Sequence, residues 1–250
     1  MISPFLPERR VVLVTGAARR VGAQIARTLH AAGYDIGLHY RHSDEAARAL
    51  ATELEQQRAD SVALLPADLT DVAALPPLVD AVVARFGRLD GLINNAATYH
   101  ATPLGSVTAA DWDALFNVNA RAPLFLAQAA AEQLRASRGA IVNIADIYAE
   151  RPLPRHVAYC MSKAAVVMLT RALAQELGPQ VRVNAIAPGN VLWSTNPVKA
   201  ETTQMVEERT TLARQGTPGE IAAAVLYLLR DASYCSGVVL PVDGGRLLHV

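Results

Sequence analysis

The side chains best suited to chemistry in this sequence are Asp146, Tyr159 and Lys163. Tyr159 and Lys163 are four residues apart in a stretch with helical pattern, so both project from one face of a helix. Because a nearby ammonium favours the phenolate, we expect Lys163 to lower the pKa of Tyr159 toward neutrality and make it a usable proton donor. Asp146 lies 13 residues before Tyr159. As a buried carboxylate it would have a raised pKa and could pass a proton with Tyr159, whereas the alternative is a helix or loop cap.

The elements that must position these residues alternate regularly along the chain. Ala/Leu-rich stretches of helical length separate short apolar runs rich in valine and isoleucine, at Val11–Val14, Ile36–Leu38, Val62–Leu65, Leu92–Ile93, Ile141–Ile144, Val183–Ile186 and Val238–Val242. This alternation predicts βαβ units and a parallel sheet covered on both faces. We expect residues 1–8 to form a loose, flexible arm and 9–250 a single α/β domain.

Local signals mark helix starts and one break in the rhythm. Asp44 is expected to cap the helix from Glu45 to Gln57 and Asp71 the next one, and Thr108 to Asp111 has the spacing of a capping box. From 190 to 216 the pattern turns polar and irregular, which favours a substrate lid.

Composition excludes several classes of partner. Lys plus Arg and Asp plus Glu are equal at 23 each, so no overall charge attracts nucleic acid or an anionic membrane. The apolar run Ile221–Leu229 is about half the length that crosses a bilayer. Cys160 and Cys235 fit reduced core thiols better than a disulfide or a metal site, which favours the cytoplasm.

A nucleotide-binding turn is predicted after the first strand. Thr15-Gly16-Ala17-Ala18-Arg19-Arg20-Val21-Gly22 leads into a helix expected at Ala23–Ala32. A glycine turn between a strand and a helix offers backbone N–H groups and the positive end of the helix dipole to a phosphate. The Arg20 guanidinium could reach that phosphate or a substrate above it, or could be a solvated arginine at the helix start.

The end of the second strand favours NADPH over NADH. Arg41 lies 19 residues beyond Gly22, close to the interval at which the ribose is discriminated. Arg41, His42 and Ser43 offer a charge and donors to a 2′-phosphate, where an acid would repel it. Asp68, after the third strand, could accept from the adenine amino group or cap a turn with Thr70 and Asp71.

Together these motifs resemble the short-chain dehydrogenase/reductase family over nearly the whole chain, from Val11 to Gly245. The resemblance is carried by the glycine turn, Asn94-Asn95-Ala96, Asn119, Tyr159 with Lys163, Pro188-Gly189 and Val242-Asp243-Gly244-Gly245. It implies a single doubly wound domain with a seven-stranded parallel sheet (a Rossmann fold), and a tetramer with helical interfaces. By the same resemblance Tyr159 is the acid, Lys163 holds the nicotinamide ribose, and Asn119 anchors a water relay behind Lys163.

Departures from the family pattern narrow the expected substrate. Most members carry a serine where this chain has Asp146. Arg20, Tyr99 and the stretch 39–43 also depart from the common pattern, and they point to the same branch of the family. The chain is similar to the pteridine reductase branch, in which an aspartate replaces the serine, an arginine takes the place of Arg20, and an aromatic at the place of Tyr99 sandwiches the pterin against nicotinamide. A tyrosine that only fills the loop base is the alternative for Tyr99.

The expected site residues therefore fall into three groups. Those expected to be catalytic are Asp146, Tyr159, Lys163 and Asn119. Those expected to bind NADPH are Gly16, Arg19, Arg20, Val21, Tyr40, Arg41, His42, Ser43, Asp68, Leu69, Asn95, Ala96, Ala97, Tyr159, Lys163, Pro188 and Gly189. Those expected to bind substrate are Arg20, Tyr99, Asp146, Tyr159, Leu192 and Trp193, and no metal site is expected.

The expected function is an NADPH-dependent pteridine reductase that reduces dihydropterins, with oxidised pterins and folates as further candidates. The alternatives are a carbonyl reductase of the 3-oxoacyl-thioester or sugar type and, from a different class, a non-catalytic NADPH sensor. By analogy, the tail 246–250 would reach the active site of a neighbouring subunit in a homotetramer.

Overall fold

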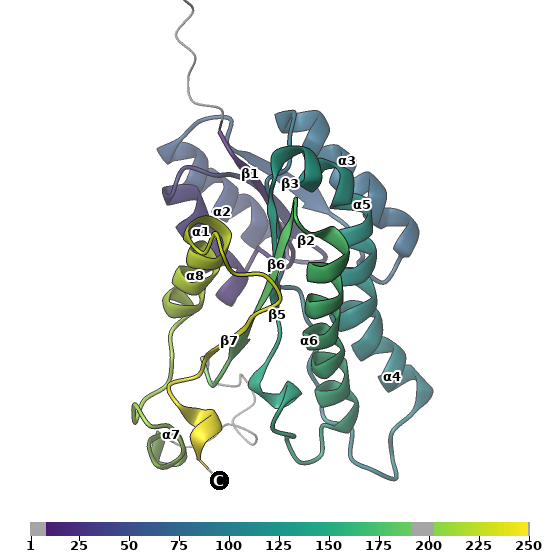
Figure 1. Cartoon of the computed structure of the whole chain (residues 1–250), viewed down its shortest axis with the longest axis vertical. Coiled ribbons are helices and arrows are strands. Elements are labelled where there is room, and N and C mark those ends of the chain that lie inside the picture. The colour runs from purple at the N-terminus through teal and green to yellow at the C-terminus, as the bar shows by residue number, and fades with distance from the viewer. Residues whose placement is uncertain (1–8, 192–202, 250) are drawn as a thin grey trace, which may run out of the picture.

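A parallel seven-stranded sheet forms the centre of the molecule (Figure 1). The computed structural model describes residues 9–191 and 203–249, and the strand order is β3-β2-β1-β4-β5-β6-β7. The strands are β1 (Val11–Val14), β2 (Asp35–Tyr40), β3 (Val62–Pro66), β4 (Gly91–Asn94), β5 (Ala140–Ile144), β6 (Arg182–Pro188) and β7 (Val239–Val242). The expected strands and the doubly wound α/β fold are confirmed, whereas the predicted arm 1–8 lies outside the described residues.

Helices cover both faces of this sheet (Figure 1). They are α1 (Arg20–Ala31), α2 (Asp44–Gln57), α3 (Leu75–Phe86), α4 (Ala109–Phe116), α5 (Ala122–Ser137), α6 (Val157–Leu177), α7 (Thr203–Arg209) and α8 (Pro218–Leu226). Short helical turns are η1 (Val72–Ala74), η2 (Asn117–Arg121), η3 (Ile147–Ala149), η4 (Tyr227–Asp231) and η5 (Arg246–Leu248). The turn η2 is a π-helix between α4 and α5, a form often found at functional positions.

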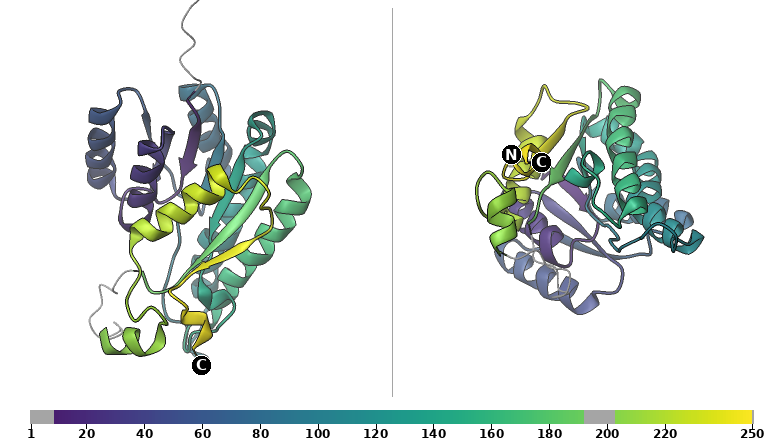
Figure 2. Two further views of the ribbon diagram at one scale, coloured as in Figure 1. Left: turned by 60° about the vertical axis from the view of Figure 1, so that its left-hand side comes forward. Right: turned by 90° about the horizontal axis from the view of Figure 1, so that it is seen from below.

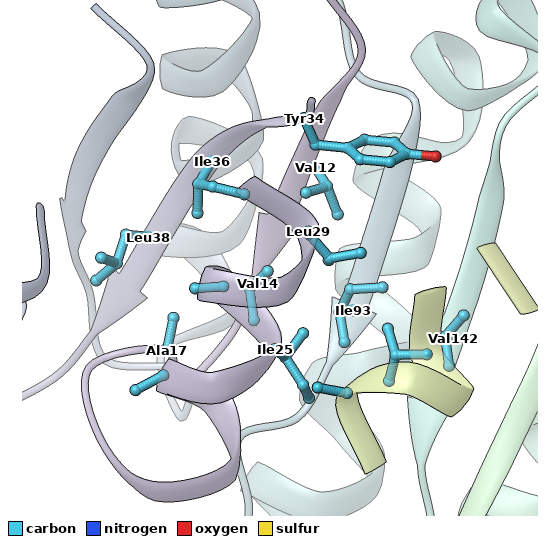
Figure 3. Packing of buried hydrophobic residues seen from close by; sticks show 14 of the residues in the cluster. Val12, Val14, Ala17, Ile25, Leu29, Tyr34, Ile36, Leu38, Ile93 and Val142 are labelled. Carbon is cyan, nitrogen blue, oxygen red and sulfur yellow. The ribbon is translucent and has the colours of Figure 1, made fainter. Parts of the chain in front are cut away.

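The core lies in two layers because successive strand side chains point to opposite faces. Val12 and Val14 of β1 pack with α1, α2 and α8, whereas Val11 and Leu13 pack with α3 and α5 on the other face. Figure 3 shows Ile25 of α1 beside the strand residues of the first layer. Burial on both faces explains why the strand runs are continuously apolar.

Side-chain caps fix several helix starts. Thr108 and Asp111 form the predicted capping box of α4. Asp71 accepts the Ala73 N–H at 3.0 Å and so caps η1, the turn that leads into α3. The expectation that Asp44 caps α2 is wrong, because its carboxylate binds the Tyr40 hydroxyl and the Arg48 guanidinium, each at 2.7 Å, and Asp44 is itself the first helical residue.

The carboxyl ends of the strands meet at one edge, where the candidate site residues gather. Strand order reverses between β1 and β4, and such a switch point is where ligands bind in open α/β sheets. Helix α6 is apolar and long enough to cross a membrane by length and composition, but it packs on β6 and carries buried polar residues of the site.

The C-terminal segment turns back on its own chain. The Asp243 carboxylate accepts the Gly245 N–H at 2.9 Å and the Leu247 N–H at 2.8 Å, and the Leu212 N–H donates to the Gly244 carbonyl at 3.0 Å. The left-hand view in Figure 2 places the C-terminus at one end of the sheet and shows α7 at that same end. Up to His249 the tail is therefore held within its own chain, and its reach into a neighbouring site stays a prediction.

Gly22 in the first turn of α1 allows this helix to approach the β1 turn. A Cβ at Gly22 would lie 2.2 Å from the Gly16 carbonyl oxygen, whereas a Cβ at Gly219 in α8 has no neighbour closer than 3.7 Å. We predict that Gly22→Ala lowers the free energy of unfolding by about 2 kcal/mol or more, while Gly219→Ala changes it by less than about 1 kcal/mol or raises it. Urea denaturation measures both, and equal losses would contradict the close approach.

Candidate active site

A short hydrogen bond joins the end of β5 to the start of α6. The Tyr159 hydroxyl, in the first turn of α6, donates to Asp146 Oδ2 at 2.6 Å. The other carboxylate oxygen, Oδ1, accepts the Tyr148 N–H at 2.9 Å and caps η3. The two roles weighed for Asp146 therefore coexist, because one oxygen caps the turn and the other binds the phenol.

Lys163 lies on the same face of α6 as Tyr159. Its Nζ donates to the Ile144 carbonyl at 2.9 Å and lies 5.9 Å from the centre of the Tyr159 ring. The side chain is buried, and this burial lowers the pKa of Lys163 to about 8, an effect that the Asp146 charge partly opposes. Lys163 therefore holds the end of β5 and can lose its charge at mildly alkaline pH.

The pKa of the phenol moves opposite to the sequence-based expectation. Burial, the Asp146 charge and the bond to Asp146 raise the pKa of Tyr159 well above its ordinary value. The Lys163 ammonium does not offset this rise; it donates to the Ile144 carbonyl and lies 5.9 Å from the centre of the Tyr159 ring. Burial also raises the pKa of Asp146, as expected, although the Tyr148 N–H, Tyr159 and Lys163 work against it. Asp146 and Tyr159 therefore each hold their proton to a higher pH than the same group does in water.

Asn119 connects this pair to the segment after β4. Its Oδ1 accepts the Thr98 N–H at 2.8 Å, and its Nδ2 donates to the Thr98 carbonyl and the Ser162 hydroxyl, both at 2.9 Å. Ser162 directly precedes Lys163 in α6. Asn119 therefore fixes the loop that carries Tyr99 relative to α6, and its relay function stays a prediction.

Tyr99 lies beside Tyr159. Its ring is perpendicular to Tyr159 with centroids 4.8 Å apart, and it stacks on His156 at 5.0 Å with an interplanar angle of 12°. Tyr99 is 56% exposed, so it does not simply fill the loop base. The contact of His156 with Tyr99 was not predicted from the sequence. The sequence shows only that His156 lies three residues before Tyr159, whereas its stacking partner lies in a loop distant in sequence.

The predicted nucleotide turn closes tightly after β1. Gly16 has a φ of 63°, and a Cβ there would lie 3.0 Å from Ala96 Cα. The Asn95 side-chain amide donates to the Thr15 and Gly16 carbonyls at 2.8 and 3.1 Å. Arg20 has a φ of 54°, a strained value for a residue other than glycine. The turn thus brings α1, the loop after β4 and exposed arginines together.

Arg41 and Asp68, assigned to different parts of the cofactor, pair with each other. Arg41 Nη2 lies 2.8 Å from Asp68 Oδ2, and both side chains are partly exposed. Asp68 Oδ1 also accepts from the Thr70 N–H at 2.9 Å and its hydroxyl at 2.8 Å, which is the turn-capping alternative. Exposed ion pairs contribute at most about 1 kcal/mol, so a bound phosphate could displace Asp68 from Arg41.

The other residues expected to bind the cofactor lie along the same edge of the sheet. They differ in exposure: buried are Tyr40 and Leu69; exposed are Arg19, Arg20, Arg41, His42 and Ala97; intermediate are Val21, Ser43, Asn95, Ala96, Pro188 and Gly189. Leu192 and Trp193 lie outside the described residues, as does 192–202 of the predicted lid.

A cavity of about 410 Å³ lies next to this edge and is lined by Val191, Leu212, Ile221, Asp243 and Leu248 among others. Asp146, Tyr159 and Lys163 do not line it. The candidate active site is therefore defined by the hydrogen bonds among its side chains and not by this cavity.

Comparison with known proteins places the chain in a family. Residues 16–246 match the family model described as enoyl-(acyl carrier protein) reductase. Pteridine reductase 1 of Leishmania tarentolae is 36% identical, covering 97% of this chain and 98% of that protein. A putative ketoacyl reductase of the granaticin polyketide synthase from Streptomyces violaceoruber is also 36% identical, covering 97% and 98%.

A 3-oxoacyl-[acyl-carrier-protein] reductase of Staphylococcus aureus (strain Mu50) is 33% identical, covering 94% of this chain and 97% of that protein. Identity alone therefore does not choose among these substrates. The fold, the order of the motifs and these full-length similarities agree, and the chain belongs to the short-chain dehydrogenase/reductase family of NAD(P)H-dependent oxidoreductases.

Proposed function

We propose that this protein is an NADPH-dependent pteridine reductase that reduces dihydropterins to their tetrahydro forms, with oxidised pterins and folates as further substrates. The observation that carries this proposal is the 2.6 Å bond from Tyr159 to Asp146, a carboxyl group where most members of the family have a serine. The similarity to a pteridine reductase over nearly all of both chains supports it.

The donors at the nucleotide turn fit a phosphorylated dinucleotide. The N-terminus of α1 follows a glycine turn, and no acidic residue lies in its first helical turn. Arg41 and His42 are exposed at the end of β2 and offer charge and donors to a 2′-phosphate. When bound, NADPH supplies the hydride that is transferred to the carbon of a ring C=N bond, and it leaves as NADP⁺.

Asp146 and Tyr159 can together donate the proton that the ring nitrogen takes up. With Asp146 ionised, the phenol donates to the carboxylate, as in the 2.6 Å bond. With Asp146 protonated, the carboxyl can donate to the phenol oxygen instead, which frees the Tyr159 hydroxyl to donate to the substrate. The raised pKa of Asp146 favours this second arrangement, in which a proton passes from Asp146 through Tyr159 to the nitrogen.

The flat ligand would be held by Tyr99 and by polar contacts. Tyr99 offers an exposed aromatic ring 4.8 Å from that of Tyr159, and stacking contributes roughly 0.5–1.5 kcal/mol beyond the burial of area. The Asp146 carboxylate can accept ring and amino N–H groups of a pterin. Arg20, Leu192 and Trp193 remain proposed substrate contacts.

A carbonyl reductase of the 3-oxoacyl-thioester or sugar type is the second candidate, and the similarity to acyl-carrier-protein reductases favours it. That enzyme would use Tyr159 and Lys163 without a proton from Asp146. A non-catalytic NADPH sensor is a weaker candidate, because it needs the nucleotide turn but not the linked side chains of Asp146, Tyr159 and Lys163.

We further propose a cytoplasmic homotetramer. Helices α4, α5 and α6 carry exposed apolar side chains, at Trp112, Leu124, Met161 and Met168. Where such side chains adjoin on a surface, they mark an interaction site.

The direct test is a panel of substrates with NADPH, followed by its absorbance. Dihydrobiopterin and dihydromonapterin should be reduced with higher kcat/KM than a 3-oxoacyl thioester or a sugar ketone. Rapid ketone reduction without turnover of any pterin would establish the second candidate instead, and NADPH binding without turnover of either would favour the sensor.

Removal of the Asp146 carboxyl group should lower the rate of reduction without weakening cofactor binding. Asp146→Ser is expected to lower pterin turnover at least tenfold, about 1.4 kcal/mol of transition-state stabilisation, and to leave NADPH binding nearly intact. Asp71→Ser is the matched control, because Asp71 caps a similar turn through the N–H two residues on, at 3.0 Å, without contact to the phenol. Steady-state kinetics measure the turnover of both variants. Equal losses of turnover would show that Asp146 acts only as the cap of η3.

The pH dependence of kcat/KM should show whether the protonated carboxyl group of Asp146 is needed for reduction. Because the pKa of Asp146 is raised and its protonated form supplies the proton, wild-type kcat/KM should fall as pH rises through that pKa. The variant Asp146→Asn should be slower and should lack this fall, and its decline from Lys163 should begin at a lower pH than in the wild type, because the Asp146 charge that raises the Lys163 pKa is gone. Profiles of identical shape below pH 8 would contradict the proton role of Asp146.

Cofactor choice is tested at Arg41. Arg41→Asp places a negative charge near the 2′-phosphate and should weaken NADPH binding far more than NADH binding. Arg48→Asp is the control, since Arg48 in α2 pairs with Asp44 instead. Fluorescence titration with both cofactors measures the change, and an equal loss for NADPH and NADH would refute the phosphate assignment.

A further inference from the structure

His39 lies beneath the predicted nucleotide turn, at the penultimate position of β2. The residue is 2% exposed, and its imidazole lies between the turn after β1 and the segment after β3. Its ring therefore meets the loops assigned to the phosphates and to the adenine.

Hydrogen bonds on both sides of the ring fix its tautomer. The Gly16 N–H donates to His39 Nδ1 at 3.1 Å, so Nδ1 carries no proton. His39 Nε2 lies 3.2 Å from the Ala67 carbonyl oxygen, which can only accept, so Nε2 carries the proton and donates. The backbone adds a third bond, because the Ala17 N–H donates to the His39 carbonyl at 2.8 Å.

We propose that His39 is a positioning residue of the dinucleotide site, and that its neutral imidazole links the glycine turn to the segment after β3. The ring holds Gly16, whose positive φ sets the direction of the turn, and it holds Ala67, the residue before Asp68. This inference rests on the proposed cofactor site but not on the identity of the substrate.

Protonation of His39 would break this link. A proton on Nδ1 would face the proton of the Gly16 N–H, so two donors would meet. Burial lowers the pKa of His39 to about 4, although the Ala67 carbonyl and the Asp68 charge oppose the effect. Asp68, itself paired with Arg41, is the charged group next to the ring. The link should therefore persist across neutral pH.

The tautomer is measured directly by ¹⁵N NMR of the imidazole in the full-length protein without cofactor. We expect the Nε2–H tautomer with a bare Nδ1, and no titration between about pH 6 and pH 8. An Nδ1–H tautomer, or a ring that titrates near the ordinary histidine value, would overturn the proposal. This measurement needs neither a folded variant nor catalytic activity.

Variants test whether the link serves the cofactor. His39→Phe keeps the volume but makes neither side-chain bond, and it should raise the dissociation constant of NADPH at least tenfold. The matched control is His30→Phe, because His30 is equally buried at 1% exposure but binds Ser61. The control should lose stability and keep NADPH affinity.

His39→Gln should bind NADPH with intermediate affinity, since its amide can restore one of the two side-chain bonds. NADPH affinity is measured by fluorescence titration. If His39→Phe binds NADPH like the wild type, the proposal is wrong. A wild-type protein that binds NADPH but reduces no pterin leaves this inference standing and refutes only the proposed substrate, whereas one that binds no NADPH refutes the cofactor site itself.

Discussion

The 2.6 Å hydrogen bond between Tyr159 and Asp146 joins the two elements on which the candidate site depends. It links the first turn of α6 to the residue that caps η3 after β5, while Lys163 holds the same strand end through the Ile144 carbonyl. A serine at position 146 could also meet the phenol, but it would bring no ionisable proton. The carboxyl group therefore changes the chemistry of the site without changing the fold that presents it.

The cofactor side depends on a comparable set of contacts. Thr15 accepts the N–H groups of Asn95 and Ala96 at 3.0 Å each, so the turn after β1 and the loop after β4 close on each other. From the other side His39 binds Gly16. A parallel sheet brings these loops to one edge, but side-chain bonds between them set the shape that a dinucleotide would meet.

The sequence was sufficient for the features that depend on local pattern. Continuous apolar runs predicted the strands, and Thr108 with Asp111 predicted the capping box, because these signals lie within a few neighbouring residues. It failed where burial or a competing partner decides. Asp44 does not cap its helix because Tyr40 and Arg48, each four residues away, bind its carboxylate. The pKa of Tyr159 is raised and not lowered because the phenol is buried and bound to Asp146. The contacts of His156 and His39 join segments far apart in sequence, which local pattern does not show.

The claim that most needs measurement is that Asp146 keeps its proton beside Tyr159 under conditions in which exposed aspartates are ionised. A ¹³C NMR titration of the aspartate carboxyl groups measures this directly, with the Asp146 signal assigned by its loss in Asp146→Asn. The account predicts an apparent pKa for Asp146 above the ordinary value of 3.8, because burial disfavours its charge. A carboxyl that titrates at or below that value would contradict the account, since Asp146 would then have no proton to pass through Tyr159.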